Sequence, residues 1–404
     1  MKYLSLFLLL NINISEIMAD DFFVDDFNSF FDDVNPGDGV CAGDFTATCT
    51  LHAAIQETNA TPGSHRIFLP AGTHINASLS KSFHIIDSDI EIIGEGMNAT
   101  IIDARQLDQA FNLSRSSVTF KDLSIINGKA LAGNPSPLGG AIYAITGPSE
   151  LSTLILNRVK LSNNSANNGG AVRCVNMNVA IYSSVLLNNT LEDLGVTNMR
   201  GSAISILRGG IKIYDSSISN NTNGLSAIVI IDSGIDMQNT TVSNNDSIGL
   251  DTQNVSAKIK FSTFSNNNYN LSHFSFDGSR LMEIDSSLVQ NATTRNCLTS
   301  PTQKPTSLGY NISDDASCEF LQATDMESTD AQLGILMNNG GTTASHLPAV
   351  TSPTIDNIPL TDCLNIIDDP LTNDQRHFLR PVAMACDSGS VERRLETVFI
   401  DDFE

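Results

Sequence analysis

The sequence is poor in aromatic and basic residues. Its 404 residues include no tryptophan, and aromatic residues make up 6% of the chain. The 22 Lys and Arg are outnumbered by 45 Asp and Glu, which gives a formal net charge of −23. A chain of this charge should repel nucleic acid and anionic membrane, so neither is expected as a partner. Beyond residue 10 no apolar run is long enough to cross a bilayer, so no membrane span is expected.

The N-terminus has the pattern of a secretory signal peptide. Lys2 is followed by an apolar run over residues 3–10, and Ile17-Met18-Ala19 offers a cleavage site before Asp20. We therefore expect residues 1–19 to be removed and the mature protein to be exported.

A short frame recurs seven times along the middle of the chain and predicts its architecture. The frames begin at Val118, Leu154, Val179, Ile211, Ile235, Ala257 and Leu281. Nine residues later stand Asn127, Asn163, Asn188, Asn220, Asn244, Asn266 and, as the exception, Gln290. The third frame position is apolar in six frames, with Glu283 as the exception, and the position two before the end is apolar in all seven.

The spacing of the frames predicts a parallel β-solenoid. Successive frames start 22 to 36 residues apart, which is too short for a propeller blade, and no helical pattern falls within the interval. Apolar residues at alternating positions, broken by Asn and Gly, are typical of short strands. One coil per frame would stack equivalent residues at about 4.8 Å, and Asn suits both side-chain ladders and left-handed corners.

The N-terminal region predicts a cap for the solenoid. Residues 51–60 form an amphipathic pattern after Thr50, a suitable N-cap residue. A helix laid across the first coil would shield its open edge.

Seven cysteines fit an exported protein. Cys41 with Cys49, Cys297 with Cys318, and Cys363 with Cys386 are sequential pairs that would close local loops, although six cysteines allow fifteen pairings. Cys174 is left over beside an apolar strand, which favours a buried inert thiol over a reactive one.

Two groups of motifs resemble secreted bacterial β-helix proteins. Near the N-terminus, Cys49 to Ala60 and Ile67 to Thr73 resemble the CSLREA-type start of such proteins, with His52 where Arg is usual. Near the C-terminus, the matching segments resemble a choice-of-anchor Q module, with His377 where Gly is usual. They are Asn339-Gly340-Gly341, Ser352 to Asp356, Asp374-Gln375-Arg376, Arg380-Pro381 and Cys386 to Glu392.

This resemblance to the pectin-lyase-like superfamily implies an all-β fold, a right-handed parallel β-helix with an N-terminal capping helix and an irregular disulfide-containing C-terminal module. We expect five regions. They are a signal peptide at 1–19, an N-terminal cap at 20–66, coils at 67–295, a closing module at 296–396 and an acidic tail at 397–404. The resemblance also implies location outside a bacterial cell or on its surface.

No catalytic motif is evident in the sequence. The N-T-D, D-D, G-H-G and R-I-K series of polygalacturonases and the R-x-P-x-x-R of pectate lyases are absent, and Lys212 follows the coil alternation as an outward residue. The seven His show no metal-ligand spacing, so no metal site is predicted, and Ca²⁺ is not indicated by any motif.

The two longest intervals between frames contain insertions, which in solenoids often project from one face and bind ligands. The alternative is that they are tolerated decorations. Candidate ligand-binding residues in them are Lys129, Asn134, Glu192, Asp193 and Arg200.

The sequence alone favours a monomeric, non-enzymatic protein for extracellular or cell-surface binding or adhesion, with a glycan or a surface protein as partner. The alternatives are a polysaccharide lyase or glycoside hydrolase, and a passive scaffold. Carboxylates facing an Arg or Lys in a groove would favour the enzyme.

Overall fold

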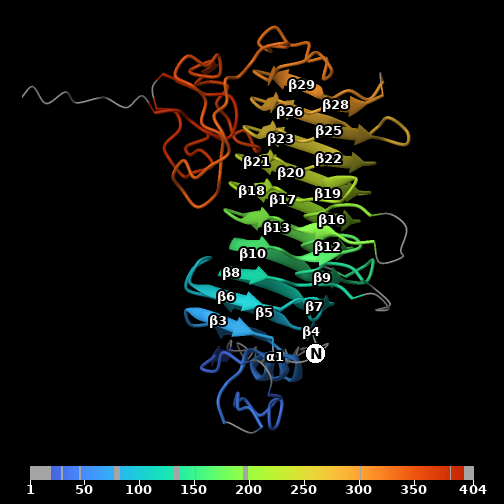
Figure 1. Ribbon diagram of the computed structural model, residues 1–404, viewed down its shortest axis with the longest axis vertical. Helices are drawn as coiled ribbons and strands as arrows, with labels where there is room; N and C mark the ends of the chain where they lie inside the picture. Colours follow the sequence, from blue (N-terminus) through green and yellow to red (C-terminus); the bar gives the residue numbers. More distant parts are fainter. Residues whose placement is uncertain are drawn as a thin grey trace, which may run out of the picture.

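The computed structural model describes residues 20–28, 31–44, 47–76, 82–131, 137–150, 152–193, 199–300, 302–382 and 384–394. The expected signal peptide and acidic tail lie outside these residues. The chain forms a parallel β-solenoid, with coils stacked along its long axis from α1 near the N-terminus to β29 (Figure 1). The all-β solenoid predicted from the frames is therefore confirmed.

Each coil contributes strands to two long sheets. The nine-stranded sheet consists of β4 (Phe83–Ile86), β7 (Phe111–Ser114), β9 (Ile142–Ile145), β12 (Val172–Val175), β16 (Ile204–Leu207), β19 (Ser226–Ile231), β22 (Ile248–Gln253), β25 (Tyr269–Phe274) and β28 (Arg295–Thr299).

The nineteen-stranded sheet is bent into two strips. The first strip consists of β1 (Asp20–Phe23), β2 (Ser64–Phe68), β5 (Asp89–Ile93), the first halves of β8 (Ser117–Ile126) and β10 (Thr153–Ser162), β13 (Asn178–Tyr182), β17 (Gly210–Tyr214), β20 (Gly234–Gln238), β23 (Ser256–Lys260), β26 (Met282–Asp285) and β29 (Thr306–Gly309). The second strip consists of β3 (Gly72–Ile75), β6 (Thr100–Asp103), the second halves of β8 and β10, β14 (Val185–Leu187), β18 (Ser217–Ser219), β21 (Thr241–Ser243), β24 (Thr263–Ser265), β27 (Leu288–Gln290) and β30 (Ile312–Ser313). Two small sheets pair β11 (Ser165–Ala166) with β15 (Thr190–Leu191) and β31 (Ile358–Pro359) with β32 (Ala385–Cys386).

The helix α1 (Leu51–Ala60) covers the first coil. The Thr50 hydroxyl accepts a hydrogen bond from the Ala53 amide at 3.0 Å, as expected of an N-cap residue. Leu51 and Ile55 are buried against the core, and the helix contacts β2 and β4. Parallel pairing runs from β1 to β30 at Ser313, beyond the expected boundary of the coils at residue 295.

The register of the strands corrects the last frame. Ala257 pairs with Met282, and Ile259 with Ile284, so the seventh frame begins at Met282 rather than Leu281. Both apparent exceptions then disappear, because Ile284 replaces Glu283 in the core and Asn291 takes the corner place assigned to Gln290. Two adjacent apolar residues, Leu281 and Met282, made the start ambiguous in the sequence.

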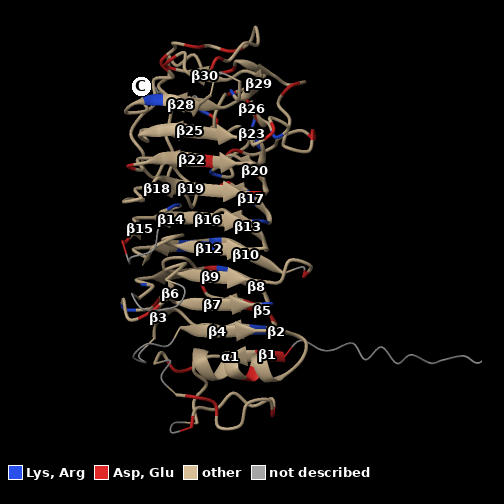
Figure 2. Ribbon diagram, turned by 90° about the vertical axis from the view of Figure 1, so that its right-hand side faces the viewer, with Lys and Arg blue, Asp and Glu red and all other residues tan. Residues whose placement is uncertain are grey.

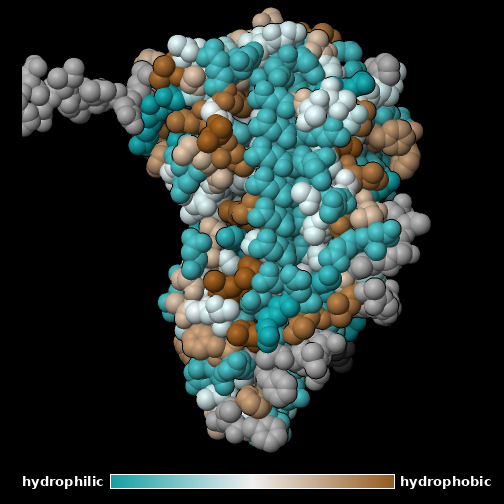
Figure 3. Space-filling model, viewed as in Figure 1, coloured by the Kyte–Doolittle hydropathy of each residue, from teal (hydrophilic) through white to brown (hydrophobic). Residues whose placement is uncertain are grey.

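The terminal asparagines of the frames form left-handed corners. Asn188, Asn220, Asn244 and Asn291 have φ between 54° and 58°, a range that Asn adopts more readily than most residues. Asn188, Asn244 and Asn266 are exposed. Figure 3 shows a hydrophilic band along the long axis of this face of the solenoid.

The next residue in each coil, not the corner residue itself, forms the asparagine ladder. It comprises five buried residues, each with a relative exposure of 0–2%: Asn164, Asn189, Asn221, Asn245 and Asn267. From Asn189 onward, each Oδ1 accepts from both the backbone amide and the Nδ2 of the asparagine before it, at 2.9–3.0 Å. The Oδ1 of Asn164 accepts from the Gly128 amide at 2.8 Å. Nδ2 also donates to a backbone carbonyl, as Asn189 does to Leu161 at 3.1 Å.

The cysteines form the disulfides Cys41–Cys49, Cys297–Cys318 and Cys363–Cys386, the sequential pairs expected from the sequence. Cys174 is free and fully buried on β12. Burial raises the pKa of its thiol to about 12, which keeps it protonated and unreactive.

The described residues of 314–394, here called the C-terminal segment, dock on the bend between the two strips. Figure 1 shows the red part of this segment alongside the coils, whereas its orange first part, in which Met326 pairs with Ile312, lies on the end of the stack. His377 is hydrogen-bonded to Ser183 at 2.9 Å, His346 to Ser243 at 2.8 Å, and the Thr241 hydroxyl donates to Gln375 at 2.6 Å. Within the segment, buried Arg380 pairs with Glu392 at 3.1 Å.

We predict that Asn221→Ala destabilises the solenoid by about 3 kcal/mol, because it leaves the buried Asn189 amide and Leu186 carbonyl without their partners. Denaturant unfolding followed by far-UV circular dichroism would measure the loss. The matched control is Asn244→Gly, which keeps the left-handed corner and should cost less than about 1 kcal/mol. Equal losses in both variants would contradict a structural role for the ladder.

Candidate functional site

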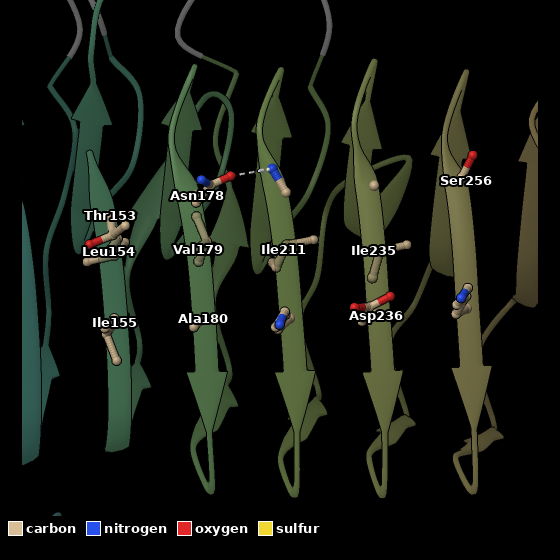
Figure 4. A pocket seen from close by; sticks show the side chains of 14 residues that line it. Thr153, Leu154, Ile155, Asn178, Val179, Ala180, Ile211, Ile235, Asp236 and Ser256 are labelled. Carbon is tan, nitrogen blue, oxygen red and sulfur yellow. Dashed lines mark hydrogen bonds between the residues drawn. The ribbon is translucent and has the colours of Figure 1, made fainter. Parts of the chain in front are cut away.

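The outer face of the first strip carries a groove. Its volume is about 570 Å³, and it crosses β10, β13, β17, β20 and β23. It is lined by Thr153, Leu154, Ile155, Asn178, Val179, Ala180, Gly210, Ile211, Lys212, Gly234, Ile235, Asp236, Ser256 and Lys258. Figure 4 shows the labelled side chains in rows across parallel strands, with the Asn178 side chain accepting from the Gly210 amide at 2.9 Å.

The rows follow from the strand register. The first strip turns every second residue inward, so that Leu154, Ile211 and Ile235 belong to the core. Gly210 and Gly234 have no side chains, so the surface is hollowed beside these strands and the groove reaches apolar atoms.

The outward row at the centre of the groove alternates in charge. Lys212 is paired in register with Asp236, Asp236 with Lys258, and Lys258 with Glu283. Neighbouring members of this row are therefore separated by one strand spacing, about 4.8 Å between backbones. Lys212 and Lys258 are exposed and Asp236 is half-buried.

These charges have no ion-pair partner, unlike several other charges on the coils. Arg115 pairs with Asp87, and Arg158 with Asp122, each at 2.6 Å. Among the described residues, Lys212, Asp236 and Lys258 take part in no ion pair within 4.0 Å. Their charges are thus available to a ligand.

Two tyrosines lie in the next outward row. Tyr182 and Tyr214 pack edge to face, with ring centroids 5.8 Å apart. Burial, reinforced by the negative charge of Asp236, raises the pKa of Tyr214 above its usual value. At neutral pH Tyr214 is therefore a protonated phenol beside the charged row.

The C-terminal segment closes one end of the groove. A second hollow of about 150 Å³ there is lined by Lys258, Ile259, Lys260, Glu283, Leu308, Ile366 and Asp368. Lys260 lies 3.3 Å from both Asp285 of the coil and Asp368 of the segment. Burial raises the pKa of Asp285, and the charge of Lys260 opposes the shift.

The same rows continue toward the N-terminus. A hollow of about 490 Å³ across β2, β5 and β8 is lined by Ser64, His65, Arg66, Asp89, Ile90, Glu91, Ser117 and Thr119. Arg66 in this hollow is neutralised by Asp21 at 2.7 Å. Arg66 is thus less available to a ligand than Lys212 and Lys258 in the groove.

The residues proposed from the two insertions lie outside this groove. Lys129 and Glu192 form an ion pair at 3.1 Å that joins the insertions, and Arg200 donates to Gln253 at 2.6 Å. Asp193 is exposed, and Asn134 lies outside the described residues.

Sequence reasoning missed Lys212, Asp236 and Lys258, although it identified Lys212 as outward-facing. The sequence did contain a pattern that could have identified them. The three residues occupy the same outward position, one residue after the frame start, in consecutive frames.

No group of three or more His, Cys, Asp or Glu among the described residues is arranged to hold a metal ion. In the part of the chain that the structure describes, no helix is both long and apolar enough to span a membrane.

Comparison with known proteins identifies the fold. No family model and no curated protein sequence matches the chain. Pectate lyase Pel9A matches with a TM-score of 0.57 and 13% identity, over 94% of this chain and 98% of that one. The chain thus has the parallel β-helix fold of this pectate lyase. The A-module of the Azotobacter vinelandii mannuronan C-5 epimerase AlgE6 matches with a TM-score of 0.32 and 13% identity, over 72% and 86% of the two chains.

These findings correct the function expected from the sequence. The non-enzymatic adhesion or binding protein expected from the sequence is contradicted, because the solved structure matched over 94% of this chain is a pectate lyase, which favours the polysaccharide lyase kept as the alternative. The sequence-based prediction favoured a non-enzymatic protein because no contiguous catalytic motif was found along the chain.

Stability should depend on pH through Asp215, which follows Tyr214 at the edge of the groove. Burial raises the pKa of Asp215 to about 6, against a hydrogen bond from Asn239 and the positive charge of Arg380. Since this pKa lies above that of an unfolded Asp, the group stabilises the fold most below pH 4 and loses that contribution as the pH rises through 6.

We therefore expect Asp215→Asn to stabilise the protein by about 1–3 kcal/mol at pH 7.5 and to make little difference at pH 4. Thermal or denaturant unfolding at both pH values would test this. Asp232→Asn, at an exposed corner with the same left-handed backbone, is the control and should show no such pH-dependent gain.

Proposed function

We propose that this protein is a polysaccharide lyase that cleaves an acidic polysaccharide bound along the groove. The observation that carries the proposal is the row Lys212, Asp236 and Lys258, whose charges lack ion-pair partners among the described residues and lie on the floor of an elongated hollow. The parallel β-helix shared with a pectate lyase supports it.

The groove suits a polymer because its chemistry repeats at the strand spacing. Equivalent residues recur at about 4.8 Å along the solenoid, a step comparable to the length of one sugar ring in an extended chain. The hollows at both ends continue the same rows, so several sugar units can be bound in line. Apolar atoms of Ile155 and Ala180 would contact ring faces, while the lysines would bind acidic substituents.

The row provides the groups that β-elimination requires. Lys212 and Lys258 would pair with a uronate carboxylate, which stabilises the negative charge that develops when the adjacent C5–H is deprotonated. Asp236, between them, would accept the C5 proton as general base. The electron pair forms the C4–C5 double bond, the glycosidic C4–O bond breaks, and the phenol of Tyr214 would donate a proton to the leaving oxygen.

A glycoside hydrolase is the second candidate, favoured by Asp236 and Glu283. These carboxylates belong to one row and are two strand spacings apart, about 9.6 Å between backbones. Inverting glycosidases separate their carboxyl groups by about 6.5–9.5 Å. The two reactions differ in product, since only elimination leaves an unsaturated sugar.

We further propose that the protein is exported and meets its glycan outside the cell. The three disulfides and the signal-like residues 1–19 support this location. The resemblance to CSLREA-type and choice-of-anchor Q segments remains a prediction from the sequence.

The first experiment is to incubate the purified chain with polygalacturonate, alginate and a neutral glucan, with and without Ca²⁺. Ultraviolet absorbance would report unsaturated ends, and a reducing-end assay would report every cleavage. We expect both signals on an acidic polymer. Reducing ends without absorbance would indicate hydrolysis, and no cleavage of any acidic polymer would contradict the proposal.

Variants of the charged row should separate catalysis from binding. Asp236→Asn should lower kcat by about 10²–10⁴-fold with little change in KM, as expected for a general base. Lys258→Ala should lower kcat/KM by about 10–100-fold, because it removes a charge-assisted contact with the substrate. Lys160→Ala, on β10 but outside the groove lining, is the control and should retain activity. Equal losses in Lys258→Ala and Lys160→Ala would rule out a specific role for the row.

A further inference from the structure

A separate cavity lies on the nine-stranded sheet, away from the groove on the first strip. It has a volume of about 260 Å³ and is lined by Asn168, Arg173, Arg200, Ser205 and Ile231. Arg173 projects from the outer face of β12, and Arg200 comes from the end of the insertion that follows β15. In Figure 2, which faces this sheet, β12 carries one of the few blue segments on a largely uncharged surface.

The two guanidinium groups are incompletely satisfied. Arg173 donates to the Ser205 hydroxyl at 2.7 Å, and Arg200 to the Gln253 side chain at 2.6 Å. The Nε of each is shielded from solvent and has no hydrogen-bond acceptor among the described residues. Buried donors of a charged group rarely remain unpaired, since the loss of hydration is costly.

The cavity also has an excess of positive charge. Arg173 forms no ion pair with any described residue, and the charge of Arg208 acts on it unfavourably. Asp251 is the carboxylate whose charge faces Arg200, and it is held by Gln253 at 2.8 Å. The stretch between Asp193 and Arg200 contains no acidic residue. In a chain of net charge −23, such a local surplus of arginine requires an explanation.

We infer that this cavity binds an oxyanion group, carboxylate or sulfate, between Arg173 and Arg200. The guanidinium groups of both arginines line the cavity and would donate to the anion, and the Ser205 hydroxyl lies beside them as a further donor. The cavity volume of about 260 Å³ is large enough for a small anion or for one acidic substituent of a sugar. The site is independent of the proposed cleavage, because it lies on the other sheet and shares no lining residue with the groove.

Isothermal titration of the full chain with sodium sulfate, at constant ionic strength against chloride, tests the inference. A second arm uses a short oligogalacturonate, which distinguishes a free anion from an acidic group carried by a glycan. We expect one sulfate site per chain, and Arg173→Gln and Arg200→Gln should each weaken binding at this site about tenfold or more. The groove would bind the oligogalacturonate as well, so only the part of its binding that both cavity variants weaken is assigned to the cavity.

The control is Arg158→Gln, which removes an arginine paired with Asp122 on the other sheet and should leave this affinity unchanged. Binding of sulfate would assign the site to a free anion. Oligosaccharide binding that both cavity variants weaken, without binding of sulfate, would assign it to a glycan substituent. The inference is overturned if neither ligand binds, or if both cavity variants bind as tightly as the wild type. Circular dichroism of each variant, and its cleavage activity in the groove, would show whether the chain remains folded.

Discussion

The parallel stacking of coils at one strand spacing is the constraint on which this structure depends. Each residue of a coil lies above its counterpart in the previous coil, so every backbone group at a corner must find a partner in the next coil or be buried without one. The buried ladder from Asn164 to Asn267 meets this requirement, because each amide side chain both accepts from and donates to neighbouring coils. The ladder thus holds the corners in register, and the register in turn aligns every other row.

The same constraint shapes the outer surface. Residues of one charge at equivalent places in adjacent coils would face one another about 4.8 Å apart and destabilise the stack. The row from Lys212 through Asp236 and Lys258 to Glu283 avoids this by alternating in sign. Because the alternation arises from four separate coils, a stable stack also presents cations and carboxylates in a repeating order, on which the proposed binding of an acidic polymer rests.

The sequence predicted the core and the corners well because both repeat. Apolar residues such as Leu156 and Ile181 recur in register, and the corner asparagines adopt the left-handed backbone that the frame suggested. The ladder itself was displaced by one residue from the expected place, since the corner conformation and the buried amide require neighbouring asparagines. Asn220 and Asn221 therefore divide two roles that the frame assigned to one residue.

The groove could not be found in the same way, because catalytic motifs are sought along the chain whereas its residues come from successive coils. Lys212 and Asp236 are 24 residues apart in sequence and adjacent in the sheet. The sequence also did not predict how the groove is closed at one end. Lys260 pairs with Asp368, which is 108 residues further along the chain, only because the C-terminal segment docks on the bend. The shape of this end of the groove therefore depends on the docking of the segment. The docked segment buries its own Ile366 and covers Asp215 of the coils, so it bounds the groove at the electrostatic cost of a carboxylate held near the interface.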